Sequence, residues 1–182
     1  MSDRQVAEIV AALPASVVTV GVFVNQPPEG IAMTMERTGL GAIQLHGDEH
    51  AEYLTTLQRP SWRVWKSVTL DRADALFGAW PAETTFLVDA ADPIRRGGTG
   101  QAVDWARAAD LARRRNVVLA GGLTPENVAD AIERVRPYGV DVSSGVEDAP
   151  GLKNASKVIR FLHSARRAVT DLESHKQMKG MN

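Results

Sequence analysis

Two turns built from small residues have the types and spacing needed to bind a phosphate. One is Ser143-Ser144-Gly145, which follows the strand-like run Val140–Val142, and the other is Gly121-Gly122, which follows Val117–Ala120. Small side chains let several backbone N–H groups converge on one point, which binds anions best where a helix N-terminus follows. A single Ser/Gly turn is more often a plain strand–helix connection. Two of them on successive strands favour phosphate binding.

Polar side chains follow other strand-like runs. Asp89 ends the run Thr85–Val88, where a carboxylate can act as a general acid or simply cap the next element. Gln44 and His46 lie where a side chain could face a binding site, although His46 fits a loop histidine equally well. Lys66 lies near the end of the strand-like run 63–68 and has no role that the sequence assigns. Polar groups at the carboxyl ends of parallel strands are typical of both (β/α)8 barrels and doubly wound sheets.

Single strands alternate with helices along the chain, which indicates parallel βαβ units. The expected strands are 17–24, 42–46, 63–68, 85–89, 117–120 and 139–142. The expected helices are 3–13, 31–37, 49–57, 71–80, 105–114, 126–135 and 154–168. The β-branched run Val17–Val24 predicts a strand buried on both faces. No G-x-G-x-x-G follows an early strand, which favours a barrel, although a closed barrel of this kind needs eight strands.

Composition narrows the class of protein. The 182 residues are 44% hydrophobic and 24% charged, with a net charge of −1, which predicts one globular domain over 1–172 and a polar tail over 173–182. The balanced charge predicts neither nucleic acid nor an anionic membrane as a partner. Without cysteine, the chain has no disulfide and no thiolate nucleophile. No apolar run approaches the roughly 20 residues of a membrane span, and the N-terminus lacks a signal-peptide pattern, so we expect a cytoplasmic protein.

The motifs in combination resemble the phosphoribosylanthranilate isomerase family, a (β/α)8 TIM barrel of tryptophan biosynthesis. The matching segments are Val20–Asn25, Gln44–Gly47, Leu87–Asp89, Gly97–Gly100 with Asp104-Trp105, Gly121–Val128 and Val140–Glu147. The resemblance implies an α/β chain with the equivalents of strands three to eight. The family's first strand, helix and second strand, with the cysteine that serves as general base, have no counterpart here. We therefore expect an internal Met or a truncated start at Met1.

The resemblance also implies a reaction, the Amadori rearrangement of N-(5′-phosphoribosyl)anthranilate to 1-(2-carboxyphenylamino)-1-deoxyribulose 5-phosphate. One general acid and one general base suffice, with no cofactor and no metal. Asp89 matches the general acid. The positions that match substrate or phosphate contacts are Gly121, Gly122, Ser144, Gly145, Asp141, Glu147, Gln44, His46 and Gly98. For Asp141 and Glu147, a carboxylate that structures its own loop is an equally good interpretation.

Two alternatives remain at this point. The chain is part of a complete isomerase, or it is a non-catalytic barrel that binds a sugar phosphate or is completed by a partner chain. Strands 17–24 and 139–142 would form open edges, and open apolar edges invite pairing with a second copy or another chain. The expected small-molecule partner is a phosphorylated substrate.

Overall fold

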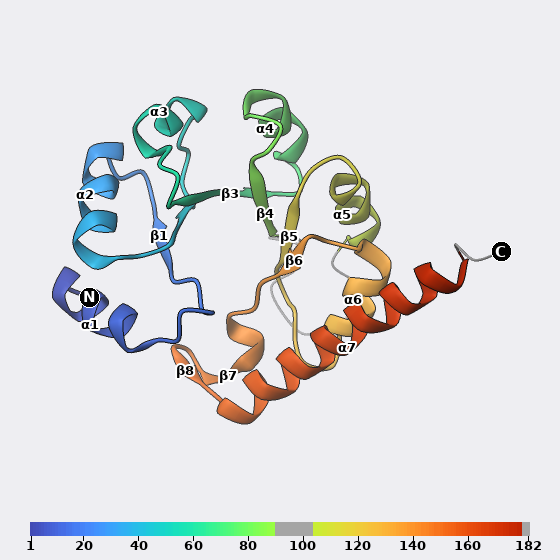
Figure 1. Cartoon of the computed structure of the whole chain (residues 1–182). Helices are drawn as coiled ribbons and strands as arrows, with labels where there is room; N and C mark the ends of the chain where they lie inside the picture. The colour runs from blue at the N-terminus through green and yellow to red at the C-terminus, as the bar shows by residue number, and fades with distance from the viewer. Residues whose placement is uncertain (90–103, 180–182) are drawn as a thin grey trace. The chain divides into compact units, whose positions relative to one another are not determined.

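The computed structural model describes residues 1–89 and 104–179, in which strands and helices alternate (Figure 1). The helical elements are α1 (Asp3–Ala12), α2 (Pro28–Thr38), η1 (Ala51–Tyr53), α3 (Leu54–Leu57), α4 (Ala73–Ala79), α5 (Trp105–Ala112), α6 (Val128–Val135), η2 (Ser144–Val146) and α7 (Ala155–Lys179). The strands are β1 (Val20–Phe23), β2 (Ala42–Leu45), β3 (Arg63–Thr69), β4 (Thr85–Asp89), β5 (Val117–Ala120), β6 (Gly139–Val140), β7 (Glu147–Ala149) and β8 (Leu152–Lys153). The first six form a parallel sheet in chain order, which confirms the predicted α/β class.

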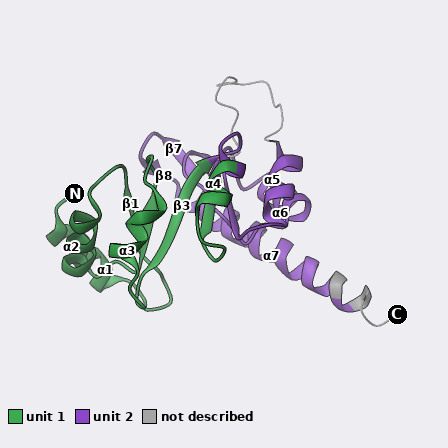
Figure 2. Ribbon diagram, turned by 90° about the horizontal axis from the view of Figure 1, so that it is seen from above, with its two compact units in different colours: residues 1–68, 75–86 green, residues 69–74, 87–182 purple. Residues whose placement is uncertain are grey.

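The chain divides into two compact units (Figure 2). Unit 1 consists of residues 1–68 and 75–86, and unit 2 consists of 69–74 and 87–182. The single domain over 1–172 stays a prediction.

Unit 1 holds the first strands and the helices that cover them. Residues Val20–Phe23 of β1 pair in parallel with Ala42–Leu45 of β2, and β2 pairs with β3 so that Leu45 lies opposite Lys66. The largest fully buried apolar side chains of this unit are Ile31, Met35, Ile43, Leu45, Leu57 and Phe86. Helix α1 begins at a capping box in which Ser2 accepts the N–H of Gln5 and Gln5 accepts the N–H of Ser2.

Unit 2 is built on β5 and α6. All four residues of β5 are buried, and β5 pairs in parallel with β6, with Leu119 opposite Val140. On α6 the apolar residues recur at helical spacing and are all buried: Val128, Ala131, Ile132 and Val135. They pack with Leu119, Leu123, Val146, Phe161 and Ala168 in one core cluster. Helix α7 lies against α6 (Figure 1), and its buried residues Phe161 and Ala168 belong to this core.

Two expectations from the sequence were wrong. Strand β1 begins at Val20, and Val22 and Val24 are 59% and 63% exposed. Side chains two residues apart share one face of a strand, so one face of this segment is open rather than buried. Residues 173–179 are helical and continue α7, and the polar tail over 173–182 stays a prediction. The predicted helix over 49–57 begins at Ala51, as η1 followed by α3, and leaves Glu49 in a loop.

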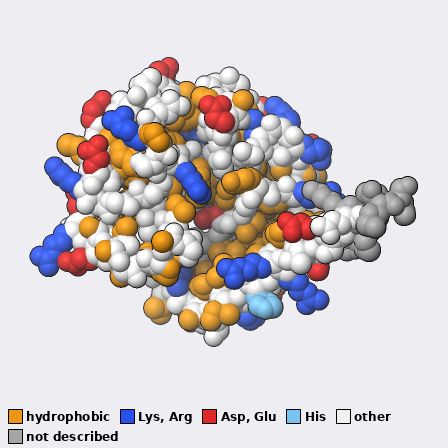
Figure 3. Space-filling view, in the orientation of Figure 1, with side chains coloured by type: hydrophobic (Ala, Val, Ile, Leu, Met, Phe, Trp, Pro, Cys, Tyr) orange, Lys and Arg blue, Asp and Glu red, His pale blue; other side chains and the backbone are white. Residues whose placement is uncertain are grey.

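The surface of α7 is mixed in character. Ile159, Leu162 and Val169 are exposed on it, and Figure 3 shows hydrophobic side chains together with Lys and Arg side chains along this helix. Within 1–89 and 104–179, no helix combines the length and the apolar character required to cross a bilayer.

Candidate functional site

The loop after β5 depends on two glycines in an unusual backbone conformation. Gly121 and Gly122 have φ angles of 90° and 64°, in the left-handed region that residues with a Cβ seldom adopt. The chain therefore turns sharply where β5 ends. Because these two positions have no side chains, backbone N–H groups can come close to an anion there, which is one way in which proteins bind phosphate.

Asn127 holds the same loop in place from the start of α6. Its Oδ1 accepts the N–H of Thr124 at 2.8 Å, and its Nδ2 donates to the carbonyl of Gly122 at 3.0 Å. Thr124 Oγ1 in turn accepts the N–H of Glu126 at 3.2 Å. This bonding joins the glycine turn to the helix that follows it.

The loop after β6 lies directly against the loop after β5. A Cβ added to Gly145 would overlap the carbonyl oxygen of Leu123 and would lie 2.9 Å from its carbonyl carbon. Real Cβ atoms do not approach this closely, so only glycine fits at position 145. The two small-residue turns predicted from the sequence are therefore in contact with each other.

A lysine from the β7–β8 hairpin supports the second loop. Lys153 Nζ donates to the carbonyl oxygen of Ser143 at 2.9 Å and to its Oγ at 3.2 Å, and it pairs with Glu147 at 2.7 Å. The hydrogen bond from Lys153 lowers the pKa of Glu147 below its usual value. Glu147 thus structures its own loop, which was one of the two interpretations open for this carboxylate. A three-residue turn, η2, and the hairpin follow Ser143, and α7 begins only at Ala155.

The two aspartates predicted for the site occupy strand ends in unit 2. Asp89 is the last residue of β4 and is exposed. Asp141 follows β6, is exposed, and donates its N–H to the carbonyl of Leu119 at 2.8 Å. Asp89, the glycine pair and the Ser144-Gly145 turn thus follow three strands that are neighbours in the sheet order.

The other predicted residues belong to unit 1 or are not described. Gln44 and His46 belong to unit 1, where Gln44 Nε2 lies 2.8 Å from His46 Nδ1 and 3.0 Å from Ser67 Oγ. His46 is exposed, whereas Gln44 and Ser67 are buried. Gly98 lies outside the described residues.

A buried ion pair in unit 1 was not predicted from the sequence. Lys66 and Glu49 have side chains that are 1% and 0% exposed, and Lys66 Nζ lies 3.0 Å from Glu49 Oε2. Burial raises the pKa of Glu49, but hydrogen bonds from the Asn25 N–H and from Lys66 outweigh it, and the pKa is lowered. The presence of Lys66 within the strand Arg63–Thr69 could have indicated this pair, because a buried ammonium requires a partner.

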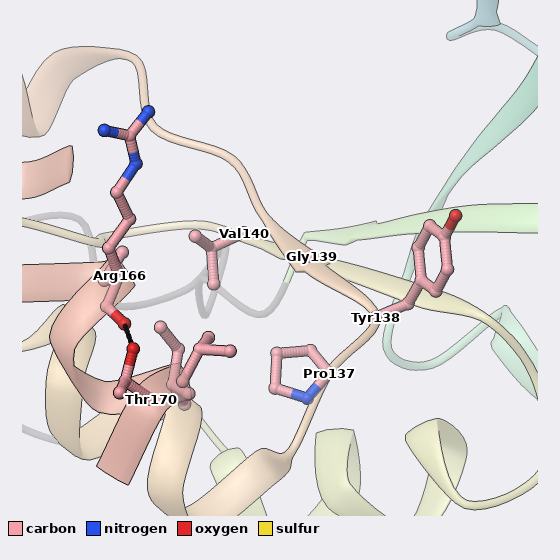
Figure 4. A pocket seen from close by; sticks show the side chains of 9 residues that line it. Pro137, Tyr138, Gly139, Val140, Arg166 and Thr170 are labelled. Carbon is pink, nitrogen blue, oxygen red and sulfur yellow. Dashed lines mark hydrogen bonds between the residues drawn. The ribbon is translucent and has the colours of Figure 1, made fainter. Parts of the chain in front are cut away.

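An apolar pocket of about 450 Å³ lies in unit 2 but contains none of the predicted residues (Figure 4). Its lining residues are Ile132, Pro137, Tyr138, Gly139, Val140, Ala165, Arg166, Val169 and Thr170. The guanidinium of Arg166 and the phenol of Tyr138 point away from it, and Thr170 Oγ1 donates to the Arg166 carbonyl. Substrate sites usually have a few convergent polar groups, and this pocket lacks such a set.

This chain matches a known protein family and is similar to known proteins. The family model for N-(5′-phosphoribosyl)anthranilate (PRA) isomerase matches residues 1–164. The N-(5′-phosphoribosyl)anthranilate isomerase of Trichlorobacter lovleyi is 42% identical over 167 residues, which are 91% of this chain and 80% of the relative. That of Roseiflexus castenholzii is 48% identical over 157 residues, or 84% and 72% of the two chains.

Solved structures of such enzymes are similar to this chain. Phosphoribosyl anthranilate isomerase from Thermotoga maritima has a TM-score of 0.79 and 39% identity, over 91% of this chain and 81% of its own. Another structure, at a TM-score of 0.76 and 36% identity over 91% and 80% of the chains, holds reduced 1-(o-carboxyphenylamino)-1-deoxyribulose 5-phosphate.

Proposed function

Since this chain belongs to the N-(5′-phosphoribosyl)anthranilate isomerase family, we propose that its unit 2 binds the phosphate of the aminoaldose substrate and supplies the general acid for its isomerisation. The reaction is the Amadori rearrangement, in which the furanose opens and a proton then leaves C2′. It needs an acid and a base, and neither a cofactor nor a metal.

The contact between the two small-residue loops is the observation that carries the phosphate site. Gly145 lies against the carbonyl of Leu123, and the glycines at 121 and 122 turn the neighbouring loop through positive φ. In the proposed site, backbone N–H groups of Gly121, Gly122, Ser144 and Gly145 surround the phosphate oxygens. Charge-assisted hydrogen bonds of this kind are each worth about 1.5–3 kcal/mol.

Asp89 is the proposed general acid. It would protonate the ring oxygen so that the furanose opens to a Schiff base, a contribution of about 10²–10⁴-fold in rate. Its position at the carboxyl end of β4 supports this role, because parallel α/β folds place their catalytic groups at that end of the strands.

The remaining predicted residues have supporting roles in this proposal. Asp141 contacts the substrate near the end of β6, and Glu147 acts on the loop through Lys153. The substrate contacts that the resemblance implies for Gln44, His46 and Gly98 stay predictions.

A second candidate function rests on the absence of cysteine from the 182 residues. The resemblance assigns the general base to a cysteine, so this chain without a further segment or partner would bind a sugar phosphate and not turn it over. We also propose a cytoplasmic location. The edge strands β1 and β6 are the proposed place for a second copy or a partner chain. A Thermotoga maritima relative is described as dimeric.

Binding and turnover together test both functions. Calorimetry with reduced 1-(o-carboxyphenylamino)-1-deoxyribulose 5-phosphate measures the site, and the disappearance of N-(5′-phosphoribosyl)anthranilate measures isomerisation. Binding with turnover that Asp89→Asn abolishes supports the isomerase. Binding without turnover supports the sugar-phosphate alternative, and a chain that does not bind the analogue would refute both.

A further inference from the structure

The carboxylate of Glu49 joins the loops after β1 and β2 to the middle of the neighbouring strand β3 in unit 1. It accepts the N–H of Asn25, which follows β1, at 2.8 Å, and the N–H of Gly47, which follows β2, at 2.9 Å. Its third partner is Lys66 of β3, whose Nζ also donates to the carbonyl of Gly47 at 2.6 Å. One buried carboxylate therefore holds three segments that are far apart in sequence.

The two loops tied by this carboxylate also fit tightly against each other. Asn25 has a positive φ of 52°, and its Oδ1 accepts the N–H of Asp48 at 2.7 Å. A Cβ at Gly47 would lie 2.7 Å from Asn25 Cγ and 2.9 Å from its backbone nitrogen. Such close approach leaves the loop over 46–49 little freedom while the bonds to Glu49 are intact.

The face of β2 and β3 opposite to Lys66 carries Gln44 and Ser67, and Gln44 contacts His46 in the loop that follows β2. Side chains alternate between faces along a strand, so Ser67 points away from its neighbour Lys66. Ser67 and Gln44 lie together, and the Gln44 amide contacts Nδ1 of the exposed His46. When the amide donates to Nδ1, the neutral imidazole carries its proton on Nε2 and directs an N–H donor outward.

We propose that Glu49 and Lys66 are positioning residues, whose buried ion pair fixes the loop over 46–49 so that Gln44 holds the His46 ring with Nδ1 engaged and Nε2 directed outward. Lys66 has three acceptors within 3.4 Å and Glu49 accepts from three groups, so neither has a free site for substrate chemistry. Their effect reaches a ligand only through His46. The proposal rests on the proposed function for the identity of that ligand.

The test compares two variants of the full chain with a matched control. Glu49→Gln keeps the shape of the side chain and removes its charge. The double variant Glu49→Leu with Lys66→Met removes both buried charges, a replacement that commonly preserves the fold. Glu8→Gln on α1 is the control, because it also removes a glutamate charge but from an exposed pair with Arg4. Nitrogen-15 NMR of the His46 imidazole reports the tautomer, and calorimetry reports the affinity for the reduced product analogue.

We expect one Nε2–H tautomer in the parent chain and in Glu8→Gln. In Glu49→Gln and in the double variant we expect exchange-averaged His46 signals and an affinity for the reduced product analogue at least tenfold lower than in the parent chain. The proposal is overturned when either of these two variants is folded and keeps the parent's His46 signals, or loses them without a change in affinity for the analogue. A parent chain that binds neither the analogue nor inorganic phosphate would refute the proposed function, and the His46 signals would then decide alone whether the pair positions the ring.

Discussion

Replacement of Gly145 by alanine should separate the two proposed phosphate loops. The new Cβ would overlap the Leu123 carbonyl and would lie 3.3 Å from Thr124 Cα, both in backbone that a rotamer change cannot move. The loops must therefore shift by about 1 Å, a misplacement that can cost roughly 100-fold where a site depends on its geometry. The loss of a single charge-assisted hydrogen bond, about 1.5–3 kcal/mol, gives a similar factor of about 10–150 in affinity.

Calorimetry with the reduced product analogue measures this loss, and two other glycines provide controls. Gly78 on α4 has no atom within 4 Å of an added Cβ, so Gly78→Ala should bind normally and should be more stable by up to about 1 kcal/mol. Gly151 has a φ of 80° and also has open space, so Gly151→Ala adds backbone strain without intrusion. An affinity in Gly145→Ala within twofold of the parent value would refute the reasoning that the loops form one site.

Three further changes test interactions within each unit. Asn127→Ala removes two hydrogen bonds from the glycine loop and should lower the free energy of unfolding by about 1–3 kcal/mol in urea titrations, together with phosphate affinity. Leu119→Ala opens a cavity in the core of unit 2 and should cost about 2–5 kcal/mol in the same assay. Because the pKa of Glu49 is lowered, its contribution to stability is complete above the ordinary carboxyl pKa and is lost as pH falls through the lowered value. The difference in unfolding free energy between the parent and Glu49→Gln should therefore shrink as pH falls through that range, and a constant difference would contradict the assignment.

Periodicity and turn residues were enough to predict the central elements. The buried run Val117–Ala120 and the helix that ends at Val135 lie where hydrophobic spacing places them. Strand β1 shows the limit of this reasoning, because a β-branched run has the same appearance whether its outer face is covered or open. Local patterns do not report which face of a strand is covered by the rest of the protein.

The small residues of the candidate site could be predicted from the sequence, but the interactions that hold their loops could not. Small residues at 121, 122 and 145 indicated loops that need close backbone approach, and the structure brings these loops together. The support that Lys153 gives to Ser143 depends on a short hairpin with no strong sequence pattern. The partner of Lys66 could not be predicted either, because Glu49 lies 17 residues before it, in a loop outside β3.

The close fit of Gly145 against Leu123 has a consequence for chimeras between relatives. A segment that contains the glycine turn after β5 carries with it the shape that the turn after β6 must match, so the two behave as one exchangeable cassette. Transfer of residues 121–127 alone into another scaffold would place the Leu123 carbonyl against whatever backbone replaces Gly145. Recombination points between β5 and β6 should therefore be tolerated poorly, whereas points before Val117 or after Lys153 keep the cassette whole.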